Sequence, residues 1–334
     1  MQTKLLKGIF ASIGILVLIL DAKTAMVGAA EGLQLCLTTV IPSLLPFFVL
    51  SIMLTSILSG ADLRILRPIG RLCKMPSGSE HLLLLGLMGG YPAGAQAVSQ
   101  AYQAGQLTRR DASRLLGFCN NAGPSFLFGI AAAAFDNRWM PWALWLIHVI
   151  SAVITGMLLP GSPEHAPFRQ KNTPLSFSQA AEQAVKVIAK VCAWIVLFRV
   201  LLAFCNRWFL WLFDKQWQVL LAGVLELANG CLQLKDISSP DLRFLFCSCI
   251  LSLGGVCVAV QTASVTGDLG FGQYFPGKLL QCGISAVLSC LLLTIVYRKL
   301  TAPWALLFAI ILSIIAIFLQ KWKNNSGNLA KVIV

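Results

Sequence analysis

The sequence predicts an all-α, polytopic membrane protein with about eight spanning helices and two re-entrant hairpins, arranged as an inverted repeat. Of its 334 residues, 57% are hydrophobic and only 12% are charged, a composition unlike that of a soluble globular domain. Apolar stretches long enough to cross a bilayer recur from end to end. Some are interrupted at mid-depth by glycine, proline and polar residues. The backbone groups freed there must face protein, water or a solute, because lipid cannot hydrogen-bond them.

Ten apolar segments are expected. They cover residues 5–20, 33–58, 81–100, 115–134, 139–159, 191–213, 217–234, 244–265, 279–297 and 303–320. Eight of them would cross the membrane once, and 81–100 and 217–234 would form the hairpins. The first segment also has the outline of a signal peptide, because Lys4 and Lys7 precede its apolar run. We prefer a short first transmembrane helix, since a polytopic chain needs no removable signal.

The basic loops set the orientation. Residues 59–80 and 101–114 each carry several arginines, so the positive-inside rule places both loops in the cytoplasm. A single crossing by the segment between them would put one loop outside. The run GGYPAG at 89–94 resolves this conflict, because it lets segment 81–100 enter, turn and leave on the same side. Each arm would then have about ten residues, half of what a spanning helix needs. Both chain termini would be cytoplasmic.

A second hairpin is expected at 217–234, opening from the outer side. The two halves also align, because a shift of 151 positions places residues 29–31 on 180–182. Each unit begins with a polar stripe at helical spacing, which predicts an interfacial helix leading into a spanning one. A repeat of helix, hairpin and helix has an odd number of crossings, so its second copy must be inverted, as in many carriers. Chance similarity between apolar segments is the alternative.

The first hairpin tip is a candidate solute site. Pro92 lacks an N–H and suits the first turn of a new helix. The N–H groups of Ala93, Gly94 and Ala95, next to Tyr91, would then lie free at the positive end of a half-helix. Such an end suits an anionic or carbonyl-bearing group. The alternative is a tight turn that only packs against a neighbour.

Polar residues at a second break extend this site. Asn120 and Asn121 precede Gly123 inside segment 115–134, and amides at bilayer depth are costly unless they are hydrogen-bonded. They could contact a solute or cap the broken backbone. Gln261 lies in the corresponding stretch of the second half, where hydrogen bonding between helices is the alternative role.

Glu226 is the carboxylate that we place at mid-depth, at the centre of the second hairpin and followed by Asn229. A carboxylate inside a membrane is a candidate proton or cation site, or a partner for a cationic ligand. We therefore expect Glu226 to line the cavity. A structural ion pair with Arg199 is the alternative.

Other classes of function find no support in the sequence. The eleven cysteines lie mostly inside apolar spans and form no C-x-x-C, so neither a metal site nor a disulfide framework is expected. Hydrolase, zinc-protease and phosphate-loop motifs are absent, which predicts no enzyme, no catalytic residue and no cofactor. The net charge of +13 gathers in short loops, so nucleic acid is not an expected partner. The expected partners are the bilayer and a small polar solute or ion, with a homo-oligomer or other envelope proteins left open.

Five motifs in this order resemble the sporulation integral membrane proteins of the YlbJ type. The motifs are PSLLPF at 42–47, GYPAGA at 90–95, FCNNAGP at 118–124, LELANG at 225–230 and QTAS at 261–264. That group belongs to a wider one with nucleoside-recognition, or Gate, domains. The resemblance implies a paired Gate-type membrane domain in the cytoplasmic membrane of a bacterium, with a role in spore cortex formation. The base- and ribose-binding residues of nucleoside carriers have no counterpart here.

Five parts of the chain are therefore expected. They are an N-terminal transmembrane helix at 1–24, a first Gate-type repeat at 25–135, a transmembrane helix with a basic cytoplasmic linker at 136–179, a second Gate-type repeat at 180–266, and C-terminal transmembrane helices with a basic tail at 267–334. The predicted function is a transporter-like protein that moves a small polar solute or ion. A non-transporting scaffold for cortex or envelope assembly is the alternative. A carrier should keep a polar cavity at mid-depth, which a scaffold could fill with side chains.

Overall fold

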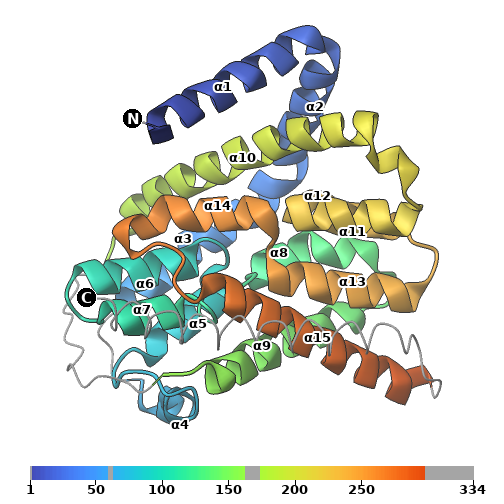
Figure 1. The fold of residues 1–334 in the computed structure, drawn as a ribbon. Coiled ribbons are helices and arrows are strands. Elements are labelled where there is room, and N and C mark those ends of the chain that lie inside the picture. Colours follow the sequence, from blue (N-terminus) through green and yellow to red (C-terminus); the bar gives the residue numbers. More distant parts are fainter. Residues whose placement is uncertain (1, 59–62, 162–173, 298–334) are drawn as a thin grey trace, which may run out of the picture.

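The computed structural model describes residues 2–58, 63–161 and 174–297, and every regular element in these ranges is a helix (Figure 1). Five helical stretches there are long and apolar enough to cross a membrane. They are Ala22–Leu58, Met140–Leu158, Phe177–Trp208, Pro240–Leu269 and Tyr274–Val296. The all-helical membrane class predicted from composition is confirmed.

Three of the eight expected crossings are not among these five stretches. Segment 5–20 lies in α1 (Gln2–Leu20), whose apolar part is short. Segment 115–134 is not one rod: α7 (Arg109–Leu115) is followed by an irregular stretch, α8 (Pro124–Gly129) and the short helix η3 (Ala131–Ala134). The polar and proline-containing sequence at 120–124 interrupts it. Segment 303–320 and the basic tail lie outside the described residues.

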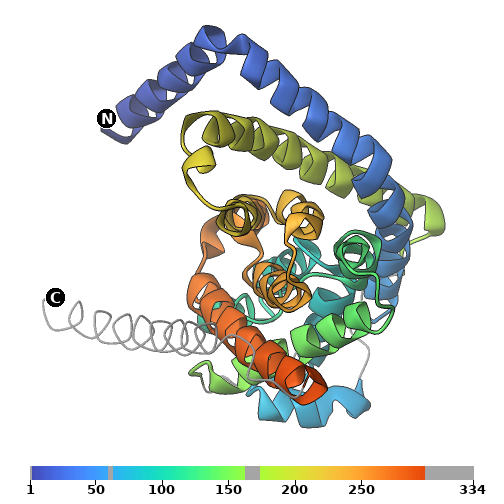
Figure 2. The same cartoon turned by 90° about the vertical axis from the view of Figure 1, so that its right-hand side faces the viewer.

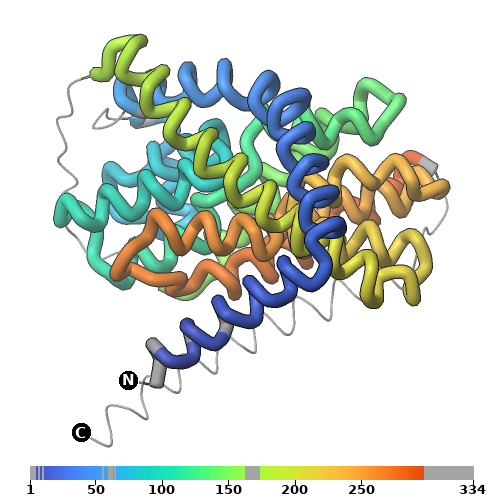
Figure 3. The backbone as a smooth tube through the Cα atoms, turned by 90° about the horizontal axis from the view of Figure 1, so that it is seen from above, coloured from blue at the N-terminus to red at the C-terminus, as the bar shows by residue number. Residues whose placement is uncertain are grey.

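Two long helices cross each other on one side of the molecule (Figures 2 and 3). The first runs without a gap through α2 (Ala22–Leu35), a π-helical turn η1 (Cys36–Val40) and α3 (Ile41–Leu58), and the second is α10 (Phe177–Trp208). Ser176 and Gln179 start α10 with a reciprocal capping box. The expected interfacial helices are thus continuous with the spanning ones, and the first stays helical through Pro46.

The crossing of these helices is antiparallel and close. A Cβ on Gly28 would lie 3.0 Å from the Cα of Val200, and a Cβ on Gly32 would lie 2.9 Å from that of Val196. The Cys36 thiol lies 3.7 Å from the carbonyl oxygen of Cys192, which precedes Val196 on α10. Glycine on α2 is therefore what lets the two backbones meet.

Two helical hairpins approach each other from opposite ends of the molecule (Figure 1). One consists of α5 (Glu80–Gly89) and α6 (Ala93–Gln103), and the other of α11 (Lys215–Leu225) and α12 (Leu227–Gln233). In each, glycines face one another across the arms. A Cβ on Gly94 would lie 2.9 Å from the Cα of Gly86, and one on Gly230 would lie 2.1 Å from that of Gly223. Both expected breaks therefore fold the chain back on itself, and their depth in a bilayer stays a prediction.

The remaining helices enclose the hairpins. They are η2 (Arg64–Leu66), α4 (Arg67–Leu72), α9 (Met140–Leu158), η4 (Leu210–Leu212), η5 (Leu234–Asp236), α13 (Pro240–Leu253), α14 (Gly255–Thr266), η6 (Gly267–Leu269) and α15 (Tyr274–Tyr297). Gly254 and Gly255 separate α13 from α14 with φ values of +77° and +79°, which a residue with a side chain rarely adopts. The corresponding position in the first half is the break between α7 and α8.

Candidate functional site

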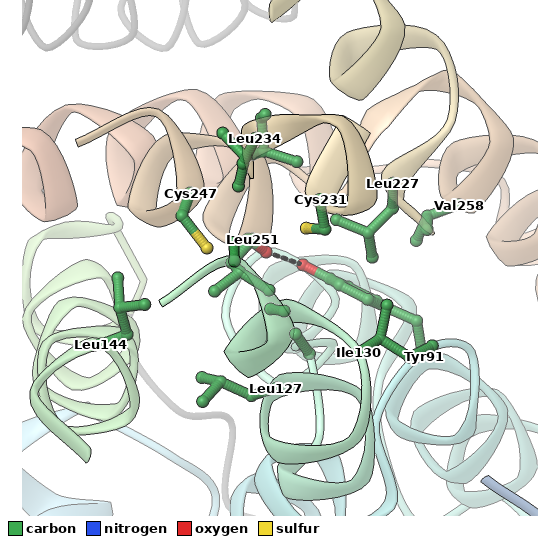
Figure 4. Packing of buried hydrophobic residues seen from close by; sticks show 14 of the residues in the cluster. Tyr91, Leu127, Ile130, Leu144, Leu227, Cys231, Leu234, Cys247, Leu251 and Val258 are labelled. Carbon is green, nitrogen blue, oxygen red and sulfur yellow. Dashed lines mark hydrogen bonds between the residues drawn. The ribbon is translucent and has the colours of Figure 1, made fainter. Parts of the chain in front are cut away.

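The two hairpin tips meet beside a small cavity of about 40 Å³. Its wall combines both hairpin tips, the break between α7 and α8, part of α14 and both long helices. The lining residues include Gly90, Tyr91, Ala122, Gly123, Glu226, Leu227, Val258, Gln261, Val40 and Val191. Apolar side chains from both halves pack around this point (Figure 4). The structure thus brings together elements that lie more than a hundred residues apart in the chain.

The tip of the first hairpin is anchored on the second half. Gly90 has a φ of +75°, and a Cβ there would lie 3.0 Å from the backbone nitrogen of Gly123. The next peptide bond, between Tyr91 and Pro92, is cis. The Tyr91 hydroxyl donates a hydrogen bond of 3.1 Å to the carbonyl oxygen of Leu251 on α13 (Figure 4). The tip therefore packs tightly, as the alternative interpretation of a simple turn requires, but it also faces a larger space described below.

Asn120 caps the second arm of this hairpin. Its Oδ1 atom accepts a hydrogen bond of 3.2 Å from the backbone N–H of Ala95, near the start of α6. Its Nδ2 atom donates one of 2.9 Å to Thr262 on α14. Asn121 instead donates from its amide to the carbonyl oxygen of Phe118, at 2.7 Å. Both asparagines are fully buried, so the structure assigns their amides to the broken backbone and its neighbours.

Glu226 has the same role in the other hairpin, where it is the N-cap of α12. Its carboxylate accepts hydrogen bonds from the backbone N–H groups of Ala228, at 3.0 Å, and Asn229, at 2.7 Å. The Asn229 amide donates a third, also of 2.7 Å. The side chain lines the small cavity although it is only 3% exposed. A carboxylate at the N-terminus of a half-helix is stabilised by those N–H groups and by the helix dipole.

Arg199 reaches Glu226 only through Asn229. The guanidinium donates to the side-chain oxygen of Asn229 at 2.9 Å and pairs with Glu31 at 2.6 Å. The ion pair that we weighed between Arg199 and Glu226 is thus absent from the described ion pairs. Glu31 on α2 takes the arginine because the crossing of α2 and α10 brings them together.

A much larger chamber of about 790 Å³ adjoins the small cavity. It lies between the first hairpin, α3, α10 and α14, and it shares Phe48, Val191 and Gln261 with the small cavity. Pro92 and Ala93 of the hairpin tip line it. Its polar lining consists of Ser51, Ser56, His81, Gln96, Ser99, Gln100, Gln103, Gln183, Lys186, Lys190, Gln261 and Ser264. No carboxylate is among the described residues of this wall, but Lys186 pairs with Glu182 beside it at 2.6 Å, so the positive charge of the wall comes from Lys190.

Two polar groups inside the chamber wall are weakly used by the protein. The Ser99 hydroxyl is buried and has no hydrogen-bond partner within the described structure. Gln261 donates only a long contact of 3.4 Å to the Cys257 sulfur. Buried polar groups are normally satisfied, so these two atoms are available to a bound molecule.

Lys278 is the main residue that the sequence analysis missed. It lies one position before segment 279–297, outside the apolar segments expected from the sequence. In the structure it is on α15 and only 1% exposed. A signal was present, because Lys278, Gln281 and Ser285 recur at helical spacing and form a polar stripe on an apolar helix. Ser285 continues the stripe with hydrogen bonds to Ser252, at 2.6 Å, and Ser151, at 2.8 Å.

Arg114 holds one end of the molecule together. Its guanidinium donates to carbonyl oxygens in the 73–74 turn and at the end of α9, among them that of Gly156 at 2.6 Å and that of Leu159 at 3.2 Å. Burial lowers the pKa of Arg114 from its ordinary value. The residue therefore has a structural role beyond the loop charge that we counted from the sequence.

A comparison with known proteins relates this sequence to a curated membrane protein. No protein-family model matches the chain, and no solved structure is similar to it. A curated relative is the sporulation integral membrane protein YlbJ of Bacillus subtilis (strain 168). The two sequences are 28% identical over an alignment that covers 83% of this chain and 79% of the relative. The chain is an integral membrane protein related to a sporulation membrane protein. With its candidate spanning helices, this supports a multi-pass arrangement of the YlbJ type.

Proposed function

We propose that this chain is a membrane carrier for a small polar solute, built from two Gate-type units of opposite orientation. The observation that carries the proposal is the polar chamber that ends at the meeting point of two hairpin tips. Paired broken helices around a mid-depth site are the common build of secondary transporters. A protein that served only as a scaffold would have no need of such an unfilled space.

The register of the long helices supports an inverted pair. Contacts between Gly28 and Val200, Gly32 and Val196, and Cys36 and Cys192 all join positions that add to 228. Continued inward, this register brings Thr38 opposite Lys190. Under the shift of 151 positions, Lys190 is the counterpart of Thr39, the residue next to Thr38. The two helices therefore cross at nearly the same position of the two repeat units. A two-fold axis through the crossing would produce this arrangement.

The chamber also indicates a class of solute. Its volume is typical of pockets that hold small metabolites. Its wall offers amides, hydroxyls and the ammonium group of Lys190, and it includes Ala93 in the first turn of α6. These groups favour a solute with carboxylate, phosphate or carbonyl oxygens over a cationic one.

The chamber would face the cytoplasm. Its outer wall includes Gln103 and Leu175, which adjoin the basic stretches at 101–114 and 160–190. The positive-inside rule places these stretches on the cytoplasmic side. The packed hairpin tips would then separate the chamber from the outer face.

Filling the chamber tests the proposal. Ala97 lines the chamber from α6, and Ala104 is exposed at the end of the same helix, so A97W and A104W form a matched pair. Thermal-shift screening of the wild type with nucleosides, amino sugars, small carboxylates and phosphates should find a stabilising solute. Reconstituted vesicles should take that solute up, A97W should lose at least about tenfold of the uptake, and A104W should keep it.

A role in sporulation is proposed as the setting of this activity. The similarity to a sporulation membrane protein supports it, and a scaffold function in spore cortex or envelope assembly is the competing view. Complementation separates the two in a spore-forming host that lacks this chain. If A97W is folded and inserted, restores sporulation fully and yet binds no solute, the scaffold function is favoured.

A further inference from the structure

The side chain of Lys278 lies in the break between α7 and α8, surrounded by neutral oxygen atoms. Its Nζ atom donates to the backbone carbonyl of Asn120 at 2.5 Å and to Gln281 Oε1 at 2.7 Å. Asn121 Oδ1, at 3.3 Å, and the Tyr91 hydroxyl, at 3.4 Å, complete the shell. The ammonium group also lies 5.4 Å from the centre of the Tyr91 ring. It therefore has four oxygen neighbours and one aromatic face.

This shell contains no negative charge. None of the ion pairs among the described residues includes Lys278, and every oxygen around it belongs to an amide, a carbonyl or a phenol. Arg199 shows the contrast, because its partly exposed guanidinium pairs with the Glu31 carboxylate. A buried charge without a counter-ion is costly unless oriented dipoles replace its water shell. Here the protein supplies those dipoles.

Contacts other than those with Lys278 orient two of these oxygens. Gln281 donates from Nε2 to Asn121 Oδ1 at 2.9 Å, which turns its own Oε1 atom toward Lys278. The Asn120 carbonyl is free for the ammonium because residues 116–123 are not helical. Unwound backbone carbonyls at a mid-depth break are the ligands that coordinate small cations in membrane carriers. Carbonyl oxygens also replace the hydration shell of ions in channel filters.

We propose that Lys278 is a tethered cation: its ammonium group occupies a carbonyl-lined monovalent-cation site and keeps that site filled in every state. The site joins the first hairpin tip, the α7–α8 break and α15. Lys278 is a positioning residue that holds these three elements together. The chain consequently needs no bound Na⁺ or K⁺ to assemble its centre. The inference rests on the packing around Lys278 alone, so it can fail while the carrier proposal stands, and the reverse.

The experiment is to vacate the site and offer it free cations. Wild type, K278A, K278M and the control K235A, whose lysine is exposed on η5 away from the chamber, would be purified in detergent. Thermal unfolding would be followed in NaCl, LiCl, KCl and choline chloride at equal ionic strength. Wild type and K235A should have the same Tm in all four salts. K278A should lose about 5 °C or more in choline and regain at least half of that loss, in a saturable manner, in one small cation.

K278M separates a cation site from simple packing. Its side chain fills the same space without a charge, so it should lose stability in choline and regain none in any salt. Three results would each overturn the proposal. They are a wild-type Tm for K278M, a K278A response to small cations that equals its response to choline, and a wild-type protein that Na⁺ stabilises over choline. The last needs no variant, so the proposal can fail even where a substituted chain does not fold.

Discussion

The two hairpins provide hydrogen-bond acceptors for the backbone N–H groups of their second arms in different ways. Each has a second arm that begins at a sharp break, with backbone N–H groups that need an acceptor. In the second hairpin the acceptor is local, because Glu226 caps the helix that follows it directly. In the first, the acceptor is Asn120 on another element, and the tip is further tied to α13 and α15 through Tyr91. The cap of the second hairpin is therefore local, whereas that of the first comes from a neighbouring element, and the first hairpin also borders the chamber.

The first hairpin is thus the one whose tip and cap are tied to the second half. Its Tyr91 contacts α13 and α15, and its cap Asn120 contacts α14. The Glu226 cap lies within the second hairpin itself. Substitutions in the two hairpins should consequently differ in how far their effects spread.

The largest expected loss of stability comes from replacing the glycines at which the two arms of each hairpin meet. In G94A the new methyl group would lie 2.1 Å from the Cys119 carbonyl oxygen, and in G230A it would lie 2.1 Å from the Gly223 Cα. Neither backbone can move aside, so each change should cost about 3 kcal/mol or more. Gly14 in α1 has no atom within 4 Å of such a methyl group, which makes G14A the control. Yield and Tm in detergent are the measurements, and a G94A protein as stable as G14A would contradict the tight hairpin.

The next largest losses of stability should follow from removing the two helix caps, Glu226 and Asn120, and these losses should differ. E226A removes a buried acceptor of three hydrogen bonds and should cost about 2–3 kcal/mol. N120A removes one cap and one link to Thr262, so about 1–2 kcal/mol is expected. The loss in N120A should be non-additive with that in T262V, because both remove the same contact. A double-mutant cycle on Tm, with the exposed E182A as control, checks this order.

The smallest effect should follow from Y91F. This change removes only a hydroxyl that donates to Leu251 and lies 3.4 Å from Lys278. A loss of about 1 kcal/mol is expected, with the aromatic ring still in place beside the ammonium. The comparison with N120A is informative. A larger loss for Y91F than for N120A would show that the tip is held by α13 rather than by its cap.

Much of the fold could be predicted from local features of the sequence. The glycines and the proline clustered at 89–94 are poor helix formers, and so are the residues at 120–124, so both breaks were accessible without coordinates. The chain does fold back at these hairpins, and their re-entrant placement in the bilayer, which the basic loops suggested, stays a prediction. The continuous helices through 22–58 and 177–208 were not foreseen, since the polar stripes at their starts favoured separate interfacial helices.

The candidate site was foreseen only in part. Tyr91, Gly123, Glu226 and Gln261 do meet at one cavity, as their breaks suggested. Their solute contacts remain a prediction. Lys278 was not predicted to be buried, because hydropathy assigns a lysine at the edge of an apolar segment to a loop. Only the polar stripe on α15 indicates that it belongs to the helix.

The sequence by itself determined that this protein is helical, lies in a membrane and folds two of its helices back at their centres. Those properties depend on composition, on charge in loops and on residues that cannot continue a helix. Only the tertiary structure decided that Glu31 takes Arg199, that Asn120 caps a helix 25 residues away from it in the chain, and that Lys278 fills a shell of oxygens. Such partners depend on the register in which helices pack, and packing joins residues that no local pattern relates.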